Sequence, residues 1–429
     1  MPAACVLLML PVFSRKLMYG YLPHACAILL CGLIITVSRS LRDRGYTASQ
    51  LGLTPMKNRD MRYDWLRLVS VLLVVLVHAI DGRMPFITEP GQTVVSGVEV
   101  HAGGTLVYIM SVLRMLGLSG NILFIMLSGA LLLKYKENES IGKFYVKRFS
   151  RVVLPMMAAI AFYLWINREI PESVPDLLKL VLYKFWTGDY SETPFYWLLY
   201  VLLSLYTVFP FFRYMFRDMP YKALTALTAA CIIFMYLQSP QRTYTFAVTT
   251  ILTWWIAFAI MGLWMSRPET ERYYKPLKFL GLTAFIYICY LIRRYGDYSS
   301  YISRIVYFTP HMSFLVMGEF ALVFDIKALK EKQNIFLRFF SKYSFSIILM
   351  HWFCLFIIVR KFLLVFDPTR LAAGVLYDFV MTIICSMAAA FAFENFVNVI
   401  PLYVFDRLVQ CLSGLYYRLV QKTLMKKQN

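Results

Sequence analysis

The stretch DWLRLVSVLLVVLVHAIDG, residues 64–82, decides the fold class, because it is apolar along a whole bilayer span yet carries charged residues. A transmembrane helix needs about 20 predominantly apolar residues. Ten runs of this kind form a core, near residues 64–82, 105–133, 152–168, 195–212, 223–239, 246–266, 277–292, 305–324, 343–359 and 372–393. We therefore predict an all-α, polytopic membrane bundle with ten core transmembrane helices.

The composition supports a membrane protein. Hydrophobic residues make up 59% of the 429-residue chain and charged residues only 16%, whereas soluble domains average roughly 45–50% and about 25%. These values exclude a soluble globular enzyme and a disordered chain. Most of the eight cysteines lie inside apolar runs, so we interpret them as small hydrophobic residues rather than a disulfide framework.

The net charge of +20 follows from 44 Lys and Arg against 24 Asp and Glu. In a soluble protein this excess would suggest nucleic acid, but in a membrane protein basic residues concentrate in cytoplasmic connections. If residues 39–63 are cytoplasmic, the inside connections hold 29 of the 44 and the outside ones 13. We expect both ends of the core in the cytoplasm and no nucleic-acid partner.

Three regions are expected along the chain: an N-terminal extension (1–55), a membrane domain (56–410) and a basic cytoplasmic tail (411–429). The extension contains one more apolar run at 21–38. This run is either an eleventh transmembrane helix or the product of a start codon assigned too early, since Met56 and Met61 lie just before the core.

Charged residues inside a bilayer span are candidates for function, because they are costly there and face the protein interior. Arg67 and His78 are 11 residues apart, which places them on one helix stripe about 16 Å apart. Asp81 follows one turn later and is positioned to orient the imidazole. The alternative is that Arg67 reaches lipid phosphates and His78 supports a helix contact.

A second cluster is Arg148 and Arg151 in KFYVKRFSRVVLP, just before Pro155. Three residues apart, they share one helix face, and guanidinium groups bind phosphate bidentately. A phosphorylated cytosolic ligand would suit them. The basic residues that topology requires at this border are the alternative explanation.

Two further features lie in FIMLSGALLL and SKYSFSIILMHWF. Ser128 and Gly129 interrupt an apolar run, which indicates either a broken helix beside a cavity or close helix packing through small residues. His351 lies mid-span in the second segment. A lone histidine in a helical bundle is more often structural than catalytic.

In this order, RYDWLRLVSVLLVVLVH, FIMLSG, KRFSRVVLP, PFYWLLYVLLSLYTVFP and KYSFSIILMH resemble the acyltransferase 3 family of integral membrane acyltransferases, over about residues 61–405. The family motifs fall on Asp64, Arg67, His78, Ser128, Gly129, Arg148, Arg151 and Pro155. Two positions depart from the pattern, with Leu68 in place of a glycine and Ile348 in place of a tyrosine.

The resemblance implies a stand-alone O-acetyltransferase of a bacterial plasma membrane. It would transfer acetyl from acetyl-CoA to a hydroxyl of a surface glycan or lipid-linked saccharide, with no metal and no tightly bound cofactor. The implied catalytic residues are His78, Arg67, Asp81 and Ser128, the implied acyl-CoA ligands are Arg148, Arg151 and Arg67, and the supporting residues are Asp64, Gly129 and His351. His78 would act as general base, with an acyl-His intermediate as a variant.

Two other functions remain open from the sequence. One is a transporter or exporter of a polysaccharide, in which buried His and acidic residues relay protons. The other is a membrane sensor or scaffold without chemistry. The sequence has no inverted repeat of the kind found in many carriers, and intramembrane charge at this density is hard to explain in a scaffold.

Overall fold

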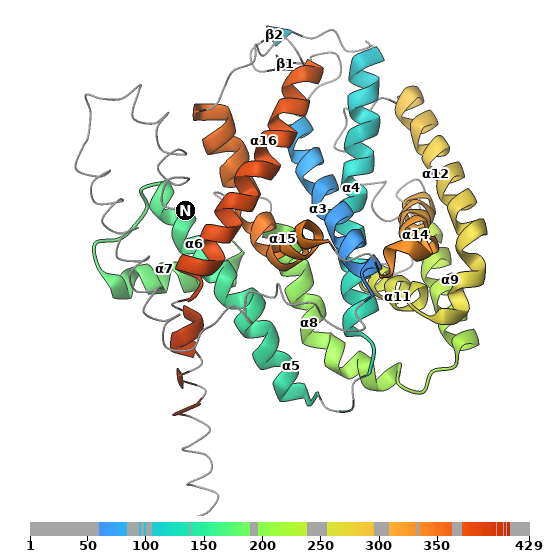
Figure 1. Ribbon diagram of the computed structural model, residues 1–429, viewed down its shortest axis with the longest axis horizontal. Coiled ribbons are helices and arrows are strands. Elements are labelled where there is room, and N and C mark those ends of the chain that lie inside the picture. The colour runs from blue at the N-terminus through green and yellow to red at the C-terminus, as the bar shows by residue number, and fades with distance from the viewer. Residues whose placement is uncertain are drawn as a thin grey trace, which may run out of the picture. The chain divides into compact units, whose positions relative to one another are not determined.

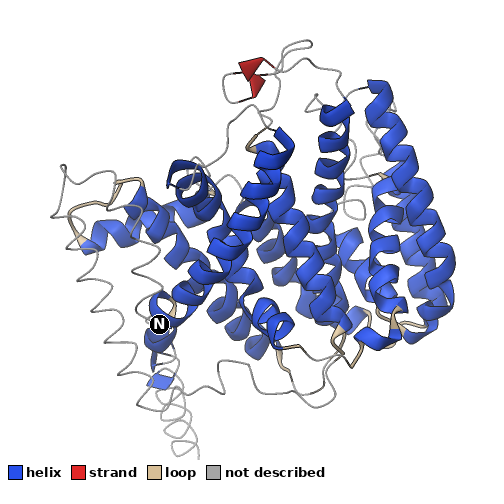
Figure 2. Ribbon diagram, turned by 45° about the horizontal axis from the view of Figure 1, so that its top comes forward, coloured by secondary structure: helices blue, strands red, loops and turns tan. Residues whose placement is uncertain are grey.

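The computed structural model describes residues 60–83, 94–95, 98–99, 105–188 except 136 and 138, 196–237, 255–295, 309–362 except 332 and 333, and 371–411 except 400, 406 and 409. This part is almost entirely helical. Its one sheet is a short antiparallel pair, β1 (Val94–Val95) with β2 (Val98–Glu99) (Figure 2). The predicted all-α class is confirmed, whereas the run at 21–38 and the tail beyond residue 411 lie outside the described residues.

The chain divides into two compact units. The larger one, within residues 51–141 and 195–388, contains α3 (Arg62–Asp81), α4 (Thr105–Leu132), α8 (Trp197–Met215), α9 (Tyr221–Leu237), α11 (Trp255–Met265), η4 (Pro268–Tyr273), α12 (Tyr274–Tyr295), α14 (Pro310–Asp325), η5 (Lys327–Leu329), α15 (Ile335–Phe353), η6 (Cys354–Phe362) and most of α16 (Leu371–Ala392). The smaller unit contains α5 (Ile141–Arg148), η1 (Phe149–Val153), α6 (Leu154–Ile166), α7 (Val174–Thr187) and η7 (Phe393–Val397).

Each of the ten predicted runs contains a helix. Among the described residues, seven helical segments are long and apolar enough to cross a membrane. The helices α9, α11 and α14 are shorter, with 17, 11 and 16 residues. The chain is therefore a polytopic helical membrane protein, and ten crossings stay a prediction.

Helix α7 lies where only a connection was expected. Its start is capped by Ser173, whose hydroxyl accepts a hydrogen bond from the Asp176 backbone N–H, and it ends at Gly188 with φ of 64°. Leu178 and Trp186 are exposed on it beside charged residues. Such an amphipathic segment, too short to span, suits a membrane interface better than a bilayer core.

Close packing of α3 against α4 explains two of the glycines upstream of Ser128. A methyl group on Gly117 would lie 3.0 Å from the Leu73 carbonyl oxygen, and one on Gly120 would lie 2.6 Å from that of Ser70. The two helices run antiparallel, side by side (Figure 1). Glycine at these points lets the two backbones approach.

Gly129 has the same role toward α11. A methyl group there would lie 2.6 Å from the Cα of Ala259, and one on Gly262 would lie 2.7 Å from the Cα of Met126. Helix α4 is continuous from Thr105 to Leu132. The interpretation as a broken helix is therefore wrong, and the alternative of close packing through small residues is confirmed.

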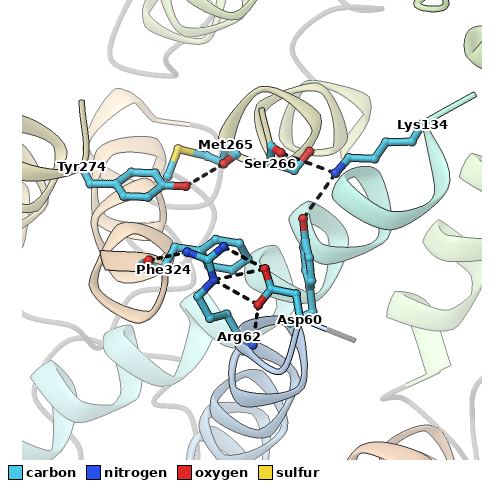
Figure 3. A network of polar contacts seen from close by, with 8 residues as sticks. Asp60, Arg62, Lys134, Met265, Ser266, Tyr274 and Phe324 are labelled. Atoms are coloured by element: carbon cyan, nitrogen blue, oxygen red, sulfur yellow. Dashed lines mark hydrogen bonds and ion pairs between the residues drawn. The ribbon is translucent and has the colours of Figure 1, made fainter. Parts of the chain in front are cut away.

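A polar network joins several helix ends of the larger unit (Figure 3). Arg62, at the start of α3, binds both Asp60 carboxylate oxygens and donates from Nη1 to the Phe324 carbonyl at 2.8 Å. Tyr274 donates to the Met265 carbonyl at 3.2 Å. The start of α3 and the end of α14 thus meet at one side of the unit, as the predicted alternation of spans requires.

Lys134, just beyond α4, belongs to the same network. Its ammonium group lies 3.4 Å from both the Tyr63 hydroxyl and the Ser266 carbonyl oxygen, which brings in the end of α11 (Figure 3). Burial lowers the pKa of Lys134, the nearby Arg267 lowers it further, and Asp60 opposes both effects. The network therefore links the start of α3 to the ends of α4, α11 and α14.

Candidate active site

Two histidines from distant parts of the sequence meet in the larger unit. The ring centroids of His78 on α3 and His351 on α15 are 5.1 Å apart, with the rings tilted by 35°. The Trp352 ring contacts His78 edge-on at 5.4 Å. Sequence reasoning placed both histidines in the candidate site, and the structure brings them together.

The two imidazoles differ in their hydrogen bonding. His351 is 1% exposed, and its Nδ1 lies 2.6 Å from the Ile348 carbonyl oxygen. Because a carbonyl only accepts, Nδ1 must carry the hydrogen. His78 is half-buried, and no hydrogen bond links either of its ring nitrogens to a described residue.

At the opposite end of α3, Asp64, Arg67 and Ser341 form a second cluster. Arg67 Nη1 lies 2.9 Å from the Asp64 carboxylate and 2.5 Å from the Ser341 hydroxyl, which in turn donates to Asp64 at 2.5 Å. Helix α15 therefore runs parallel to α3, with Ser341 beside Arg67 and His351 beside His78. The predicted column of Arg67 and His78 is matched by a second one on α15.

Asp81 does not orient His78 as predicted. Its carboxylate lies 2.5 Å from Arg114 Nε on α4, in a pair whose side chains are 18% and 8% exposed. An arginine inside a bilayer span requires a compensating charge more than an imidazole does. The expected link from Asp81 to His78 is therefore wrong. The partner of Asp81 is Arg114 on the neighbouring helix α4.

Ser128 is far from His78. Gly120 also faces Leu73 across the antiparallel α3–α4 contact, and Ser128 and His78 lie eight and five residues from these two points in opposite directions. At 1.5 Å per residue they are about 20 Å apart along the helices. The Ser128 hydroxyl donates to the Phe124 carbonyl at 3.0 Å. The prediction that it stabilises an oxyanion beside His78 is not compatible with this separation.

Arg148 and Arg151 belong to the smaller unit. Arg148 ends α5 and is half-buried, with its guanidinium 5.6 Å from the Phe144 ring centroid, whereas Arg151 is exposed. The segment between them is π-helical, η1. The expectation of a shared α-helical face assumed regular α-helix between these residues, and the structure has a wider turn there. Such turns are frequent at functional sites.

Sequence reasoning missed a third cluster near the histidines. Arg83 binds Asp378 of α16 through two hydrogen bonds of 2.8 and 2.9 Å, and Arg360 of η6 contacts the same carboxylate at 3.3 Å. Asp378 was visible in the sequence as a charge inside an apolar run. Its partners could not be identified, because they lie 295 and 18 residues away.

One more carboxyl group is buried in the larger unit. Glu319 of α14 accepts a hydrogen bond of 3.0 Å from Ser119 on α4. Among the described residues its second oxygen, Oε2, has no hydrogen-bond partner. No described basic side chain forms an ion pair with Glu319.

Residues 62–394 match the family model described as an acyltransferase domain, Acyl_transf_3. The match covers well over half of the chain, so the chain belongs to the acyltransferase 3 family. The protein is thus a membrane acyltransferase. No curated protein and no solved structure matches the chain.

Proposed function

We propose that the protein transfers an acetyl group from cytosolic acetyl-CoA to a hydroxyl of a surface or lipid-linked glycan, in the plasma membrane of a bacterium. The pairing of His78 with His351 carries this proposal. It provides a half-buried imidazole that packs against His351 and Trp352 inside the membrane domain of an acyltransferase. Imidazole suits general-base catalysis because its ordinary pKa is near physiological pH.

In the proposed reaction His78 takes the proton from the acceptor hydroxyl. The hydroxyl oxygen forms a bond to the thioester carbonyl carbon, and the resulting tetrahedral intermediate breaks its C–S bond. The proton on His78 then passes to the CoA thiolate, which leaves as the free thiol. His351 is a positioning residue, because its ring packs on His78 and its Nδ1 is held by the Ile348 carbonyl.

The donor is proposed to enter from the side that carries Arg67. The guanidinium is anchored by Asp64 and Ser341 and lies about 16 Å from His78 along α3. A phosphate at Arg67 with an extended thiol arm along α3 would bring the thioester toward His78. The resemblance to the family also implies that Arg148 and Arg151 bind acyl-CoA phosphates, and we propose this role for them.

A transporter is the weaker candidate. The family membership indicates acyl transfer, and no observation on the described residues requires a transport path. We therefore retain only the enzymatic function.

The test is acyl transfer by purified protein in lipid nanodiscs, with radiolabelled acetyl-CoA and lipopolysaccharide or isolated lipid-linked saccharides as acceptor. His78→Ala is expected to lose activity by about 10²-fold or more, the size typical of a missing general base. His311→Ala is the matched control, because His311 also lies in a helix of the same unit and packs on a tyrosine, Tyr287, at 4.7 Å. Near-normal turnover of a folded His78→Ala protein would refute the assignment.

The acceptor class is tested separately in cells. Mass spectrometry of surface glycans from cells with and without the protein should show an acetyl group that depends on it. A glycan that changes in amount but not in acetylation would support export instead.

A further inference from the structure

The cluster of Arg83, Asp378 and Arg360 has one more cation than anion. Asp378 is 1% exposed, and it faces both guanidinium groups, whose side chains are 4% exposed for Arg83 and 19% for Arg360. The neighbouring Asp81–Arg114 pair is neutral by itself. Within the described residues no second carboxylate pairs with this cluster. A positive charge so nearly buried is costly unless an anion compensates it.

Arg83 and Arg360 hold Asp378 in different ways. Arg83 uses Nε and Nη2 for a bidentate pair with both carboxylate oxygens. Arg360 contributes only Nε, at 3.3 Å. Its Nη1 and Nη2 atoms make no hydrogen bond to a described residue, so a planar donor edge stays available. Arg83 neutralises Asp378, so among the described residues the charge of Arg360 has no carboxylate of its own.

The Arg360 guanidinium is held in place by its surroundings. The Phe356 ring centroid lies 5.1 Å from Cζ, and a methyl group on Gly82 would lie 2.8 Å from the same atom. The glycine thus leaves the space that the guanidinium fills. Gly374 does the same for Arg83, since a methyl group there would lie 2.6 Å from the Arg83 Cζ.

This donor edge lies near the proposed catalytic base. The Gly82 backbone N–H donates to the His78 carbonyl at 2.9 Å, so Gly82 is one helical turn beyond His78. Because Arg360 packs on Gly82, its guanidinium lies within about one turn, roughly 5 to 6 Å of axial rise, of the His78 level. It is at the end of α3 opposite Arg67.

We propose that Arg360, supported by Arg83 and Asp378, binds an oxyanion of the acyl acceptor. The ligand is a carboxylate or phosphate group, which a guanidinium edge holds through two parallel hydrogen bonds. Such groups occur in acidic glycans and in the diphosphate of lipid-linked saccharides. This inference rests on the proposed function, because it assigns the acceptor to the His78 end of α3 and the donor to the Arg67 end.

Binding rather than turnover tests the proposal, so that it can fail independently of the acyltransfer chemistry. The full chain is placed in nanodiscs of phosphatidylcholine, which has no net charge. Two pairs of probes are titrated and followed by calorimetry: cellobiouronic acid against cellobiose, and geranyl diphosphate against geraniol. The protein is expected to bind at least one charged probe tenfold or more tightly than its neutral counterpart, and that probe identifies the source of the oxyanion.

Arg360→Gln is expected to lower the affinity for the charged probe tenfold or more and to leave the affinity for the neutral probe unchanged. Its fold should persist, because Asp378 keeps its bidentate bond to Arg83. Arg360→Lys should restore binding only in part, since an ammonium group lacks the two-pronged geometry. Gly82→Ala should reproduce the loss by displacing the guanidinium, whereas Arg217→Gln, at a 49% exposed side chain, should have no effect.

Three outcomes would overturn the proposal. They are equal affinity of the original protein for charged and neutral probes, an equal loss of affinity for both probes in Arg360→Gln, and an unchanged affinity for the charged probe in that variant. His78→Ala separates this proposal from the proposed function. It should bind the charged probe as the original protein does while failing to transfer the acyl group.

Discussion

The contact between α4 and α11 makes a strong prediction, because two glycines meet the opposite backbone there. In Gly129→Ala the new methyl carbon would overlap the Ala259 carbonyl oxygen and would lie 2.6 Å from the Cα and the carbonyl carbon of the same residue. Ordinary contact begins near 3.4 Å. The helices would have to separate by about 1 Å, which also opens the reciprocal contact at Gly262.

The size of the effect follows from the kind of obstacle. Overpacking usually costs about 1–3 kcal/mol, and backbone atoms cannot rotate away, so we place this case near 3 kcal/mol. The gain in helix propensity from Gly to Ala offsets about 1 kcal/mol. The expected net loss is therefore about 2 kcal/mol, roughly a 2 °C lower Tm for a chain of 429 residues.

Gly142→Ala is the matched control, because Gly142 also lies in a helix, α5, and a methyl group there meets nothing within 4 Å. That variant should have an unchanged or slightly higher Tm. The assay is heating of detergent-solubilised protein followed by size-exclusion chromatography of the fraction that remains monodisperse. A Tm of Gly129→Ala equal to that of Gly142→Ala would refute the packing argument.

Three further predictions follow from the polar contacts. Asp81→Asn should lower the stability by about 3 kcal/mol, the size typical of breaking a buried ion pair. Asp81→Asn combined with Arg114→Gln should recover part of that loss in the same thermal assay, and no recovery would mean that the two side chains are not coupled. Ser128→Ala should change kcat less than threefold, since Ser128 lies about 20 Å from His78, whereas a hundredfold loss would indicate an oxyanion donor. Replacing Arg148 and Arg151 together with Gln should raise the KM for acetyl-CoA about tenfold and leave that for the acceptor unchanged; an equal rise in both would point to misfolding.

Most helices and the family were predictable from the sequence, because both depend on local patterns. Spans show as apolar runs of bilayer length, and the acyltransferase resemblance depends on ordered motifs such as the one from Asp64 to His78. His78 became a candidate for function because it is an ionisable residue inside a predicted span. Helix α7 was missed because its 14 residues are amphipathic and too short for a span.

The partners of the polar side chains were not predictable. Asp81 is three residues from His78 on the same helix, which suggested a local contact, yet it binds Arg114, 33 residues away. The Ser128–Gly129 pair was compatible with a cavity or with close packing, and only the approach of Ala259 distinguished them. Sequence spacing describes neighbours on one helix and does not describe those on the next.

The amino-acid sequence alone determined that this chain is a basic, polytopic helical membrane protein with acyltransferase motifs, because hydrophobic length and charge placement act locally along the chain. Tertiary structure alone decided which charges compensate one another. It brought His351 beside His78, and it placed Arg360 on the same carboxylate as Arg83, about one turn beyond His78. Inside a membrane every buried charge needs a partner, and packing selects that partner from helices far apart in the sequence.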